Sequence, residues 1–544
     1  MGDQIKQSNE ETVKRTHGTI LRSSMIVGAF TSLSRVLGLV REMFQSRLIG
    51  AGMEQSAFTL AFAIPNATRK LFGEGALTAA FVPVFKGVVE TEGGALEKAT
   101  KLAHSVMTMV LLMLGAIAAV SFGALEIIAA LRDKIGIVDT ARFDLTLRLV
   151  STLLPYMVFI CGAAFGMGVL NALGRFKASS FMPCILNIVW ICVLGVLSFF
   201  PGLPVARRVH FVAIAILSAG ALQMGFLLWR MAKAGVKPRL TFKGWGEEKV
   251  RLVWRNVGIA ALGAGAIQLN YLLDQGLAYY ASEWAAGVIG YAERLMDLPL
   301  GVIGVAFGTV LLPTFAGLFA RGDIDGARAA LCGSVKSLMF VMLPAAAGLF
   351  ALSREITCVI YEGGGFDSMA TLRVSRALCV YALGLGSFGL MKSIVPWFHA
   401  QNDMKTPLRV SVATVILNAV LNIAAVLALP VEWRHVGLAA STVLCSFVGC
   451  TALIVLARRR NGVLGLATCI DSISRMGAAA VAMGCIVWFA RGVVAKGAAA
   501  FVPGEVAARV VALGALVALG GVTYLTLSAA LMPGQIKSLV RRRR

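Results

Sequence analysis

Apolar residues along this chain form long blocks that short polar segments separate. Each block is about 20 residues long, the length at which an α-helix crosses about 30 Å of hydrocarbon. The blocks centre near residues 36, 72, 113, 158, 190, 220, 268, 303, 343, 385, 418, 447, 482 and 519. This pattern predicts an all-α, polytopic membrane protein with about 14 transmembrane helices.

Composition points to the same class. Hydrophobic residues make up 58% of the 544 residues and charged residues 15%, whereas an ordinary soluble chain is about 45–50% apolar and about 25% charged. So few charges cannot cover a water-exposed surface. The composition therefore excludes a soluble enzyme, a collagen, a disordered chain and a disulfide scaffold.

The charge balance predicts the orientation. Lys and Arg number 51 against 28 Asp and Glu, a formal net charge of +23. If residues 1–24 are a cytoplasmic segment, basic loop residues favour the inner side by roughly three to one, as the positive-inside rule requires. We therefore expect both termini in the cytoplasm, with a basic cytoplasmic linker at 234–253 and a basic cytoplasmic tail at 533–544. No separate basic domain is present, so no nucleic-acid partner is expected.

An internal repeat predicts two lobes. Thr146–Ser151 resembles Thr371–Ser375, and a short polar turn follows each segment about 30 residues later. The offset spans six predicted helices, which gives an N-terminal lobe at 25–233 and a C-terminal lobe at 254–460. Two further helices occupy 471–532. Because each lobe has an even number of spans, the repeats are parallel and a substrate cavity is expected between them.

Charged residues interrupt several predicted spans. These are Arg35 and Arg41 in the first, Arg69, Lys70 and Glu74 in the second, Glu293, Arg294 and Asp297 in the eighth, and Lys392 in the tenth. Each charge at the bilayer centre costs about 2.5–3.5 kcal/mol on insertion scales. The excess of arginine predicts an anionic ligand, and the planar guanidinium fork suits phosphate. The alternative is that these side chains extend to the membrane interface or pair with acids such as Glu42 and Asp297.

The second span also contains residues that break helices. Pro65 and the run Gly73-Glu74-Gly75 lie within it. A break inside a membrane frees backbone groups, which only a neighbouring protein surface or a water-filled cavity can satisfy. The sequence therefore predicts an interrupted helix that borders a cavity.

Three polar residues predict a cation site. Asp274 lies in the seventh span, and Asn418 and Asn422 lie four residues apart on one face of the eleventh. A carboxylate that faces amide oxygens suits a hard cation. The alternative is a buried polar group that forms hydrogen bonds across helices.

Other chemistry has little support in the sequence. The five histidines show no metal-ligand spacing, and no Walker A glycine loop for ATP is present. No catalytic constellation appears, so the chain is not expected to be an enzyme or to need a cofactor. The ten cysteines lie almost all in apolar runs, without a Cys-x-x-Cys pair, and are expected to be small core residues.

Several motifs resemble one family. They are Ser34–Arg41 (SRVLGLVR), Ala61–Asn66 (AFAIPN), Ala80–Pro83 (AFVP), Tyr291–Met296 (YAERLM) and Asp403–Pro407 (DMKTP). Over residues 25–456 these segments resemble the MurJ (MviN) family of lipid II flippases. The resemblance implies the fold of the multidrug/oligosaccharidyl-lipid/polysaccharide exporter superfamily. Two six-helix lobes would enclose a cavity, and the helices in 471–532 would form a groove for the lipid tail.

The resemblance also assigns roles to residues. It places the diphosphate-binding arginines at Arg35, Arg41, Arg69 and Arg294, the Na⁺ ligands at Asp274, Asn418 and Asn422, and gate or supporting roles at Glu54, Ser56, Glu74, Glu293 and Lys392. Ser56 stands where the family usually has Asp, and Glu54 is a candidate substitute. Asn422 stands where some members have Asp, so the resemblance implies a weaker Na⁺ site here.

The implied function is transport of lipid II from the inner to the outer leaflet of the bacterial cytoplasmic (inner) membrane by alternating access. Without a nucleotide site, the membrane potential or an ion gradient is expected to drive it, with Na⁺ as the possible coupling ion. The expected partners are lipid II, membrane lipids and other peptidoglycan-synthesis proteins, and the chain is expected to be a monomer. Two alternatives remain open: a flippase for another lipid-linked oligosaccharide, and a non-transporting membrane scaffold for cell-wall synthesis.

Overall fold

A computed structural model describes residues 27–91, 96–135 and 140–532, and these residues form helices joined by turns and by a longer loop between Lys233 and Glu248. After a first helix over residues 27–49, the elements are α2 (Met53–Thr68), η1 (Arg69–Ala76), α3 (Leu77–Thr91), α4 (Leu96–Ile135), α5 (Thr140–Ala172), α6 (Phe176–Ser198), α7 (Val205–Lys233), α8 (Glu248–Ala281), α9 (Ala285–Ala320), α10 (Ile324–Ala351), α11 (Ser353–Tyr361), α12 (Ser368–His399), α13 (Lys405–Ala428), α14 (Val431–Asn461), α15 (Ala467–Phe501) and α16 (Glu505–Leu531). Each predicted block centre lies within a helix, so the all-α prediction is confirmed.

Ten helices in the described part of the chain are long and apolar enough to cross a membrane. They are α4, α5, α6, α7, α10, α12, α13, α14, α15 and α16. The other long helical segments are residues 27–49, α2 to α3, α8 and α9, and they contain Arg35, Arg41, Arg69, Asp274 and Arg294. Most of the candidate site therefore lies in helices outside the ten most apolar ones.

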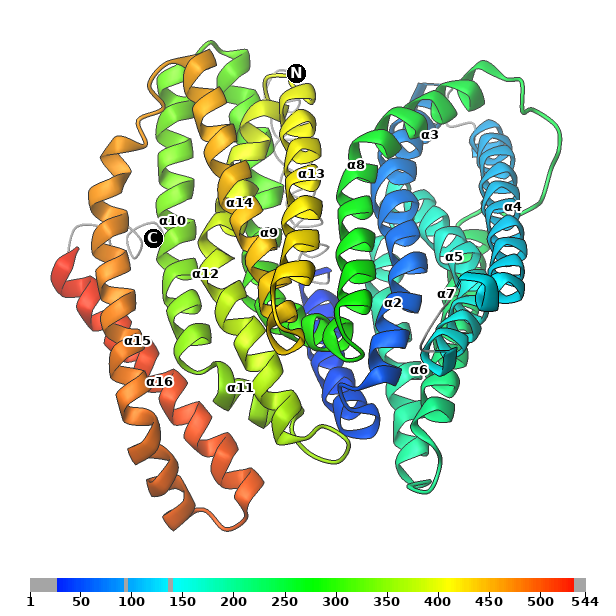
Figure 1. Ribbon diagram of the computed structural model, residues 1–544. Helices are drawn as coiled ribbons and strands as arrows, with labels where there is room; N and C mark the ends of the chain where they lie inside the picture. Colours follow the sequence, from blue (N-terminus) through cyan, green and yellow to red (C-terminus); the bar gives the residue numbers. More distant parts are fainter. Residues whose placement is uncertain (1–26, 92–95, 136–139, 533–544) are drawn as a thin grey trace. The chain divides into compact units, whose positions relative to one another are not determined.

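The described chain divides into two compact units (Figure 1). Residues up to Leu272 form the first, apart from Gly50–Gly52, which belong with Leu273 and the residues after it. Of the ten candidate spans, α5 and α12 have the largest buried shares, 78% and 50% of their most apolar stretches. These are the helices that carry the two repeated segments. The sequence repeat thus marks the central helix of each unit.

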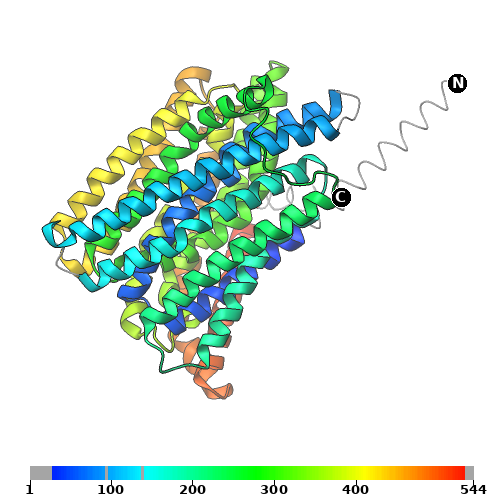
Figure 2. The same cartoon turned by 90° about the vertical axis from the view of Figure 1, so that its right-hand side faces the viewer.

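Large aromatic side chains fill the core of the first unit. Phe81 stacks obliquely on Phe165 of α5 with ring centroids 4.7 Å apart, and Phe85 lies one turn further along α3, 5.2 Å from Phe81. All three side chains are almost fully buried. Figure 2 shows the long helices α4, α5 and α7 running side by side in this unit, which places α5 in its interior.

The last two helices pack on the second unit as a hairpin. Leu352, Met483 and Leu516 share a small apolar core with Tyr524. Ion pairs at one end add to this packing, because Arg491 of α15 lies 3.8 Å from Glu355 and Arg509 of α16 lies 3.0 Å from Glu362. The hairpin is therefore joined to α10 and α11 by both apolar and ionic contacts.

Four cysteines depart from the expectation that all ten are small core residues: Cys192 and Cys485 are exposed, and Cys332 and Cys469 pair with each other. Cys332 of α10 and Cys469 of α15 form a disulfide, with Cα atoms 6.3 Å apart, within the range that a disulfide requires. The expectation was wrong for this pair because it rested on local spacing, and these residues are 137 positions apart. Packing of α15 against α10 brings them together.

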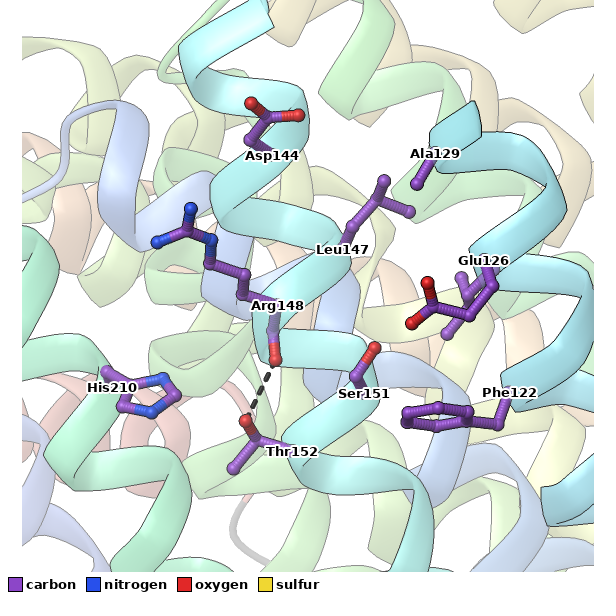
Figure 3. A pocket seen from close by; sticks show the side chains of 10 residues that line it. Phe122, Glu126, Ala129, Asp144, Leu147, Arg148, Ser151, Thr152 and His210 are labelled. Carbon is purple, nitrogen blue, oxygen red and sulfur yellow. Dashed lines mark hydrogen bonds between the residues drawn. The ribbon is translucent and has the colours of Figure 1, made fainter. Parts of the chain in front are cut away.

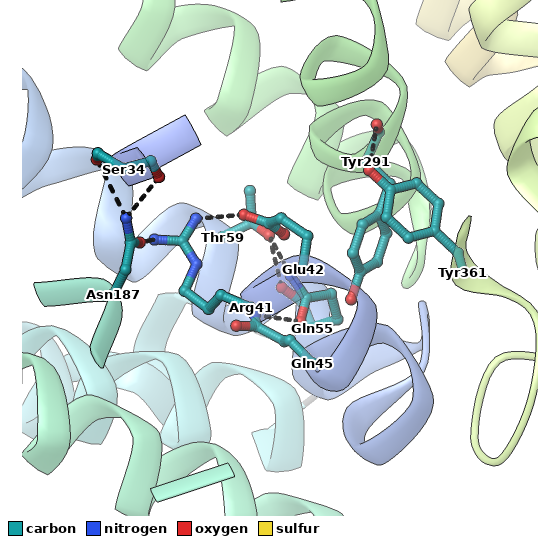
Figure 4. A network of polar contacts seen from close by, with 9 residues as sticks. All are labelled: Ser34, Arg41, Glu42, Gln45, Gln55, Thr59, Asn187, Tyr291 and Tyr361. Atoms are coloured by element: carbon teal, nitrogen blue, oxygen red, sulfur yellow. Dashed lines mark hydrogen bonds and ion pairs between the residues drawn. The ribbon is translucent and has the colours of Figure 1, made fainter. Parts of the chain in front are cut away.

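The first helix ends in a turn that only glycine accommodates. Gly50 has φ +81°, and its carbonyl oxygen accepts a hydrogen bond from the Tyr291 hydroxyl at 3.1 Å. Tyr361 in turn donates to the carbonyl oxygen of Tyr291 at 3.3 Å (Figure 4). A Cβ atom added at Gly50 would overlap the carbonyl oxygen of Gly365. The tyrosine of the Tyr291–Met296 motif therefore holds this turn in place.

The Asp403–Pro407 motif forms the turn that starts α13. Asn402 adopts a left-handed conformation with φ +58°. The Asp403 carboxylate accepts hydrogen bonds from the backbone N–H groups of Lys405 and Thr406 and from the Thr406 hydroxyl, and it pairs with Arg460 of α14. Partial burial opposes ionisation, yet these hydrogen bonds and Arg460 hold the pKa of Asp403 below its ordinary value. Asp403 of this motif thus caps α13 and also forms an ion pair with Arg460.

Replacing Asp403 by Ala should lower the free energy of unfolding by about 1 kcal/mol, the usual effect of losing such a cap. Because the folded-state pKa is depressed, the stabilising contribution is present above about pH 4 and disappears as the pH falls through the folded-state pKa. The midpoint of thermal unfolding, measured in detergent between pH 3 and pH 7, should therefore differ most from wild type at neutral pH. Asp325→Ala, whose side chain is 90% exposed, is the matched control and should change little. An equal loss in both variants would contradict the capping role.

Candidate functional site

The second predicted span changes from α-helix to π-helix around its two glycines, whereas α2 continues through Pro65 without a break. Between α2 and α3 the chain forms a π-helix, η1, over Arg69–Ala76, a conformation that often marks functional sites. Arg69 is the first residue of η1. Its Nε and Nη2 atoms donate to Oδ1 of Asn66 at 3.2 and 3.1 Å, so its guanidinium is held on the helix while its side chain stays partly exposed. Glu74 lies in η1, but its side chain is outside the described part of the structure.

Arg41 is the centre of a buried polar network (Figure 4). Its side chain pairs with Glu42, and Nη1 donates to Oδ1 of Asn187 on α6 at 3.0 Å. The Asn187 amide then donates to the backbone oxygen of Ser34 at 3.0 Å. Arg41 is only 9% exposed, and a charge at this depth needs such partners. The network therefore joins the first helix to α6.

An aromatic wall completes the surroundings of Arg41. The guanidinium carbon lies 4.3 Å from the centroid of Trp190, a cation–π geometry. Phe58 and Phe62 of α2 meet the same indole edge-on, at 5.7 and 5.8 Å. Arg41 thus matches the alternative that the sequence left open, pairing with Glu42, and its contacts favour a positioning role.

The other candidates of the first unit lie in different surroundings. Arg35 is partly exposed on the first helix, one residue after Ser34. Ser56, at the position where the family usually has Asp, is completely buried in α2. Glu54 lies in the first turn of α2 and is partly exposed, where a carboxylate is favoured by the helix dipole. The structure thus leaves Glu54 more accessible than Ser56.

In the second unit, α9 places a carboxylate and a guanidinium in succession. Arg294 is exposed, and Glu293 is partly buried. The hydroxyl of Tyr381 on α12 donates to Glu293 at 3.4 Å, and Lys392 lies further along α12 with an exposed side chain. Glu293 therefore connects α9 with α12, while Arg294 presents its charge at the surface of the unit.

The predicted cation ligands meet. Asn418 and Asn422 of α13 are 2% and 1% exposed, and their amide nitrogens donate to the same oxygen of Asp274 at 2.6 and 2.7 Å. Oδ1 of Asn422 is buried without a hydrogen-bond partner among the described residues. A half-turn of an amide exchanges its oxygen and nitrogen, so this donor set can also present a carboxylate and amide oxygens to a hard cation.

Some residues of this site have only a weak signal in the sequence. Asn187 is a single amide in an apolar run, and such a residue usually makes a hydrogen bond within the membrane. Trp190 and Tyr381 resemble ordinary apolar helix residues in the sequence. Their partners lie 149 and 88 positions away, at Arg41 and Glu293, beyond the reach of helical periodicity.

Comparison with known sequences identifies the family. Residues 45–511 match the family model described as lipid II flippase MurJ. A protein described as a probable lipid II flippase MurJ from Rhizobium tropici is 33% identical over 444 residues, which cover 81% of this chain and 82% of that protein. One with the same description from Vibrio cholerae is 32% identical over 483 residues, covering 86% and 89%.

Solved structures show the same fold. A structure described as lipid II flippase MurJ in an inward closed conformation matches with a TM-score of 0.75 at 23% identity, over 94% of this chain and 100% of that one. An inward-facing multidrug resistance transporter of the MATE family matches with a TM-score of 0.65 at 15% identity, over 79% and 95%. At these identities the likeness concerns the fold alone, and the sequence matches decide the family. This chain belongs to the MurJ family of lipid II flippases, multi-pass proteins of the bacterial inner membrane.

Proposed function

We propose that this chain moves lipid II, the undecaprenyl-diphosphate-linked precursor of peptidoglycan, from the inner to the outer leaflet by alternating access. The observation that carries the proposal is the family match over residues 45–511, in a chain whose Arg35, Arg69 and Arg294 are partly or fully exposed in helices outside the ten most apolar spans. Flippases are transporters, and the step they perform breaks no covalent bond of the cargo.

Arg35, Arg69 and Arg294 bind the diphosphate in this proposal. All three side chains are partly or fully exposed, and a guanidinium can donate two parallel hydrogen bonds to phosphate oxygens. Arg41 instead keeps the first helix in register with α6 through Asn187 and Trp190. Glu54, Glu293 and Lys392 support the gates. This division assigns the accessible cations to the cargo and the buried one to the scaffold.

The proposed topology has fourteen crossings. To the ten apolar helices it adds residues 27–49, the interrupted segment α2–η1–α3, α8 and α9. Six crossings form each lobe, at 25–233 and 254–460, and α15 and α16 provide the groove for the lipid tail. Both termini lie in the cytoplasm, and the protein works as a monomer that other peptidoglycan-synthesis proteins can contact.

Lipid binding tests the function. Purified full-length protein should bind lipid II and undecaprenyl diphosphate more tightly than undecaprenyl monophosphate, and Arg35→Ala and Arg69→Ala should each weaken lipid II binding about tenfold or more. Arg321→Ala, an exposed arginine in the turn after α9, should bind like wild type. Preference for an undecaprenyl diphosphate with a different oligosaccharide would support the alternative cargo. Equal binding by all the arginine variants would contradict the proposed roles.

Coupling to Na⁺ is proposed from the Asp274 cluster. Asp274 would provide the single negative charge, and the amide oxygens of Asn418 and Asn422 would complete the ligand set after both amides turn. With one carboxylate rather than two, the site would bind Na⁺ weakly, because affinity for a hard cation rises with the number of charged ligands. The ion would supply charge compensation that favours one conformation of the second unit over another.

Sodium should therefore stabilise the wild-type protein and not Asp274→Asn. A ligand that binds only the folded state raises the unfolding free energy by RT ln(1 + [L]/Kd), so the thermal midpoint should rise with Na⁺ relative to N-methylglucamine at constant ionic strength. Asn422→Asp should shift this rise to at least about tenfold lower Na⁺ concentration. A wild-type midpoint that is the same in both salts would rule out the site.

A further inference from the structure

A polar pocket lies in the first unit, away from every residue assigned above. It has a volume of about 420 Å³, within the usual range for small-ligand sites of about 300–1,000 Å³. In Figure 3, α5 forms the floor, while α4 contributes Glu126 and α7 contributes His210 from opposite sides. Asp144 and Arg148 project from α5, one turn apart. Three helices thus contribute four titratable side chains to the pocket.

The pocket lies where all three helices change from polar to apolar. On α4, residues 105–125 contain no charged side chain and Glu126 follows directly. On α5, residues 149–172 contain none and Arg148 precedes them, and on α7 the apolar stretch 211–229 begins directly after His210. Apolar helix stretches of this length match the hydrocarbon layer. The pocket is therefore at the level of lipid headgroups.

Its lining carries both signs of charge on accessible side chains. Glu126 and Arg148 are exposed, and Asp144 and His210 are partly exposed. Ser151 adds a hydroxyl to the lining, and the Thr152 hydroxyl donates to the backbone oxygen of Arg148 at 2.8 Å. No group of three or more metal-binding side chains occurs among the described residues, so the arrangement does not favour a metal ion. Two carboxylates beside a guanidinium and an imidazole instead match a ligand that carries both signs of charge.

We propose that this pocket binds the headgroup of a zwitterionic phospholipid that has a primary ammonium group, such as phosphatidylethanolamine. Arg148 and His210 donate to the phosphate, and the ammonium donates to Glu126 and Asp144. A primary ammonium has three N–H donors for the two carboxylates, whereas a quaternary ammonium has none and needs an aromatic cage. The lining contains one aromatic ring, that of Phe122, besides the imidazole. Phe122 and Leu125 lie on the apolar side, where the acyl chains leave. The site is independent of the proposed flippase activity.

Native mass spectrometry of the full-length protein in detergent tests the site, with phosphatidylethanolamine, phosphatidylcholine and phosphatidylglycerol added separately. The wild type should bind phosphatidylethanolamine about tenfold more tightly than the other two lipids. Glu126→Gln should remove this preference, because its affinity for phosphatidylethanolamine should fall about tenfold. Its affinity for phosphatidylglycerol should stay the same or rise. Arg148→Gln should weaken the binding of all three lipids, because each has a phosphate group.

The control is Arg207→Gln, an exposed arginine near the same end of α7 that does not line the pocket. It should retain the lipid preference of the wild type. Thermal unfolding in lipid-free detergent shows whether each variant is folded. If Glu126→Gln does not fold, Asp144→Asn replaces it as the variant that removes a carboxylate from the pocket. Equal affinity of the wild type for the three lipids, or an unchanged preference in folded Glu126→Gln, would overturn the proposal.

Discussion

Cells that rely on this chain as their only lipid II flippase should stop growing when Arg294 is replaced by Ala. Arg294 is exposed on α9, and in the proposed binding mode its loss would remove charge-assisted hydrogen bonds to the diphosphate, each worth about 1.5–3 kcal/mol. Cargo binding should fall about tenfold to a hundredfold for each bond lost, and transport should fall with it. The measurement is growth of a flippase-depleted strain that expresses the variant, with its membrane level checked by immunoblot.

Two further variants show whether charge or geometry matters at this position. Arg294→Lys retains the charge but loses the bidentate fork, so partial growth is expected. Arg321→Ala removes an exposed arginine from the turn after the same helix and should grow like wild type. Normal growth of Arg294→Ala at a normal membrane level would remove Arg294 from the cargo site.

Replacing Gly50 by Ala should strongly reduce the stability and abundance of the protein. A left-handed conformation costs a residue with a side chain about 1–2 kcal/mol, and Gly50 has φ +81°. The new Cβ would also overlap the carbonyl oxygen of Gly365, so backbone must move and the Tyr291 hydrogen bond to Gly50 is at risk. The thermal midpoint in detergent and the amount of protein in the membrane fraction measure the effect.

The chain offers a control that separates the two causes. Gly174 also has a positive φ, +72°, but a Cβ there meets nothing within 4 Å. Gly174→Ala should therefore show only the conformational cost, and Gly50→Ala should be clearly less stable. If the two variants lose the same stability, the contact with Gly365 contributes nothing.

Local patterns in the sequence were sufficient to predict the helices and the cluster of Asp274, Asn418 and Asn422. Apolar blocks predicted the helices because length and hydropathy are properties of consecutive residues. Gly73 and Gly75 lie in η1, where the helix type changes, but the break expected at Pro65 is absent because α2 continues through it. The spacing of Asn418 and Asn422 placed both on one helix face, and the structure brings both to Asp274. The bound ion and the diphosphate roles stay predictions.

Contacts between distant residues could not be predicted in the same way. Arg41 is joined to Asn187 across 146 positions, and no helical period relates the two. The ion pair between Arg41 and Glu42 could be predicted because the two residues are adjacent in the sequence. The burial of Arg41 could not be predicted, because it depends on the packing of α6. The Cys332–Cys469 disulfide has the same origin, since only the packing of α15 on α10 brings its sulfurs together.

The π-helix has a consequence for how this chain tolerates changes in length. A π-helix forms i→i+5 hydrogen bonds, one residue longer than the i→i+4 bonds of an α-helix. Removing one amino acid from η1 would therefore let this segment become α-helical while Phe81 of α3 still faces Phe165. Removing one amino acid from α3 ahead of Phe81 would instead rotate the rest of α3 by about 100° and bring Val82 to the position of Phe81. We therefore expect a single deletion in η1 to be less harmful than a single deletion in α3.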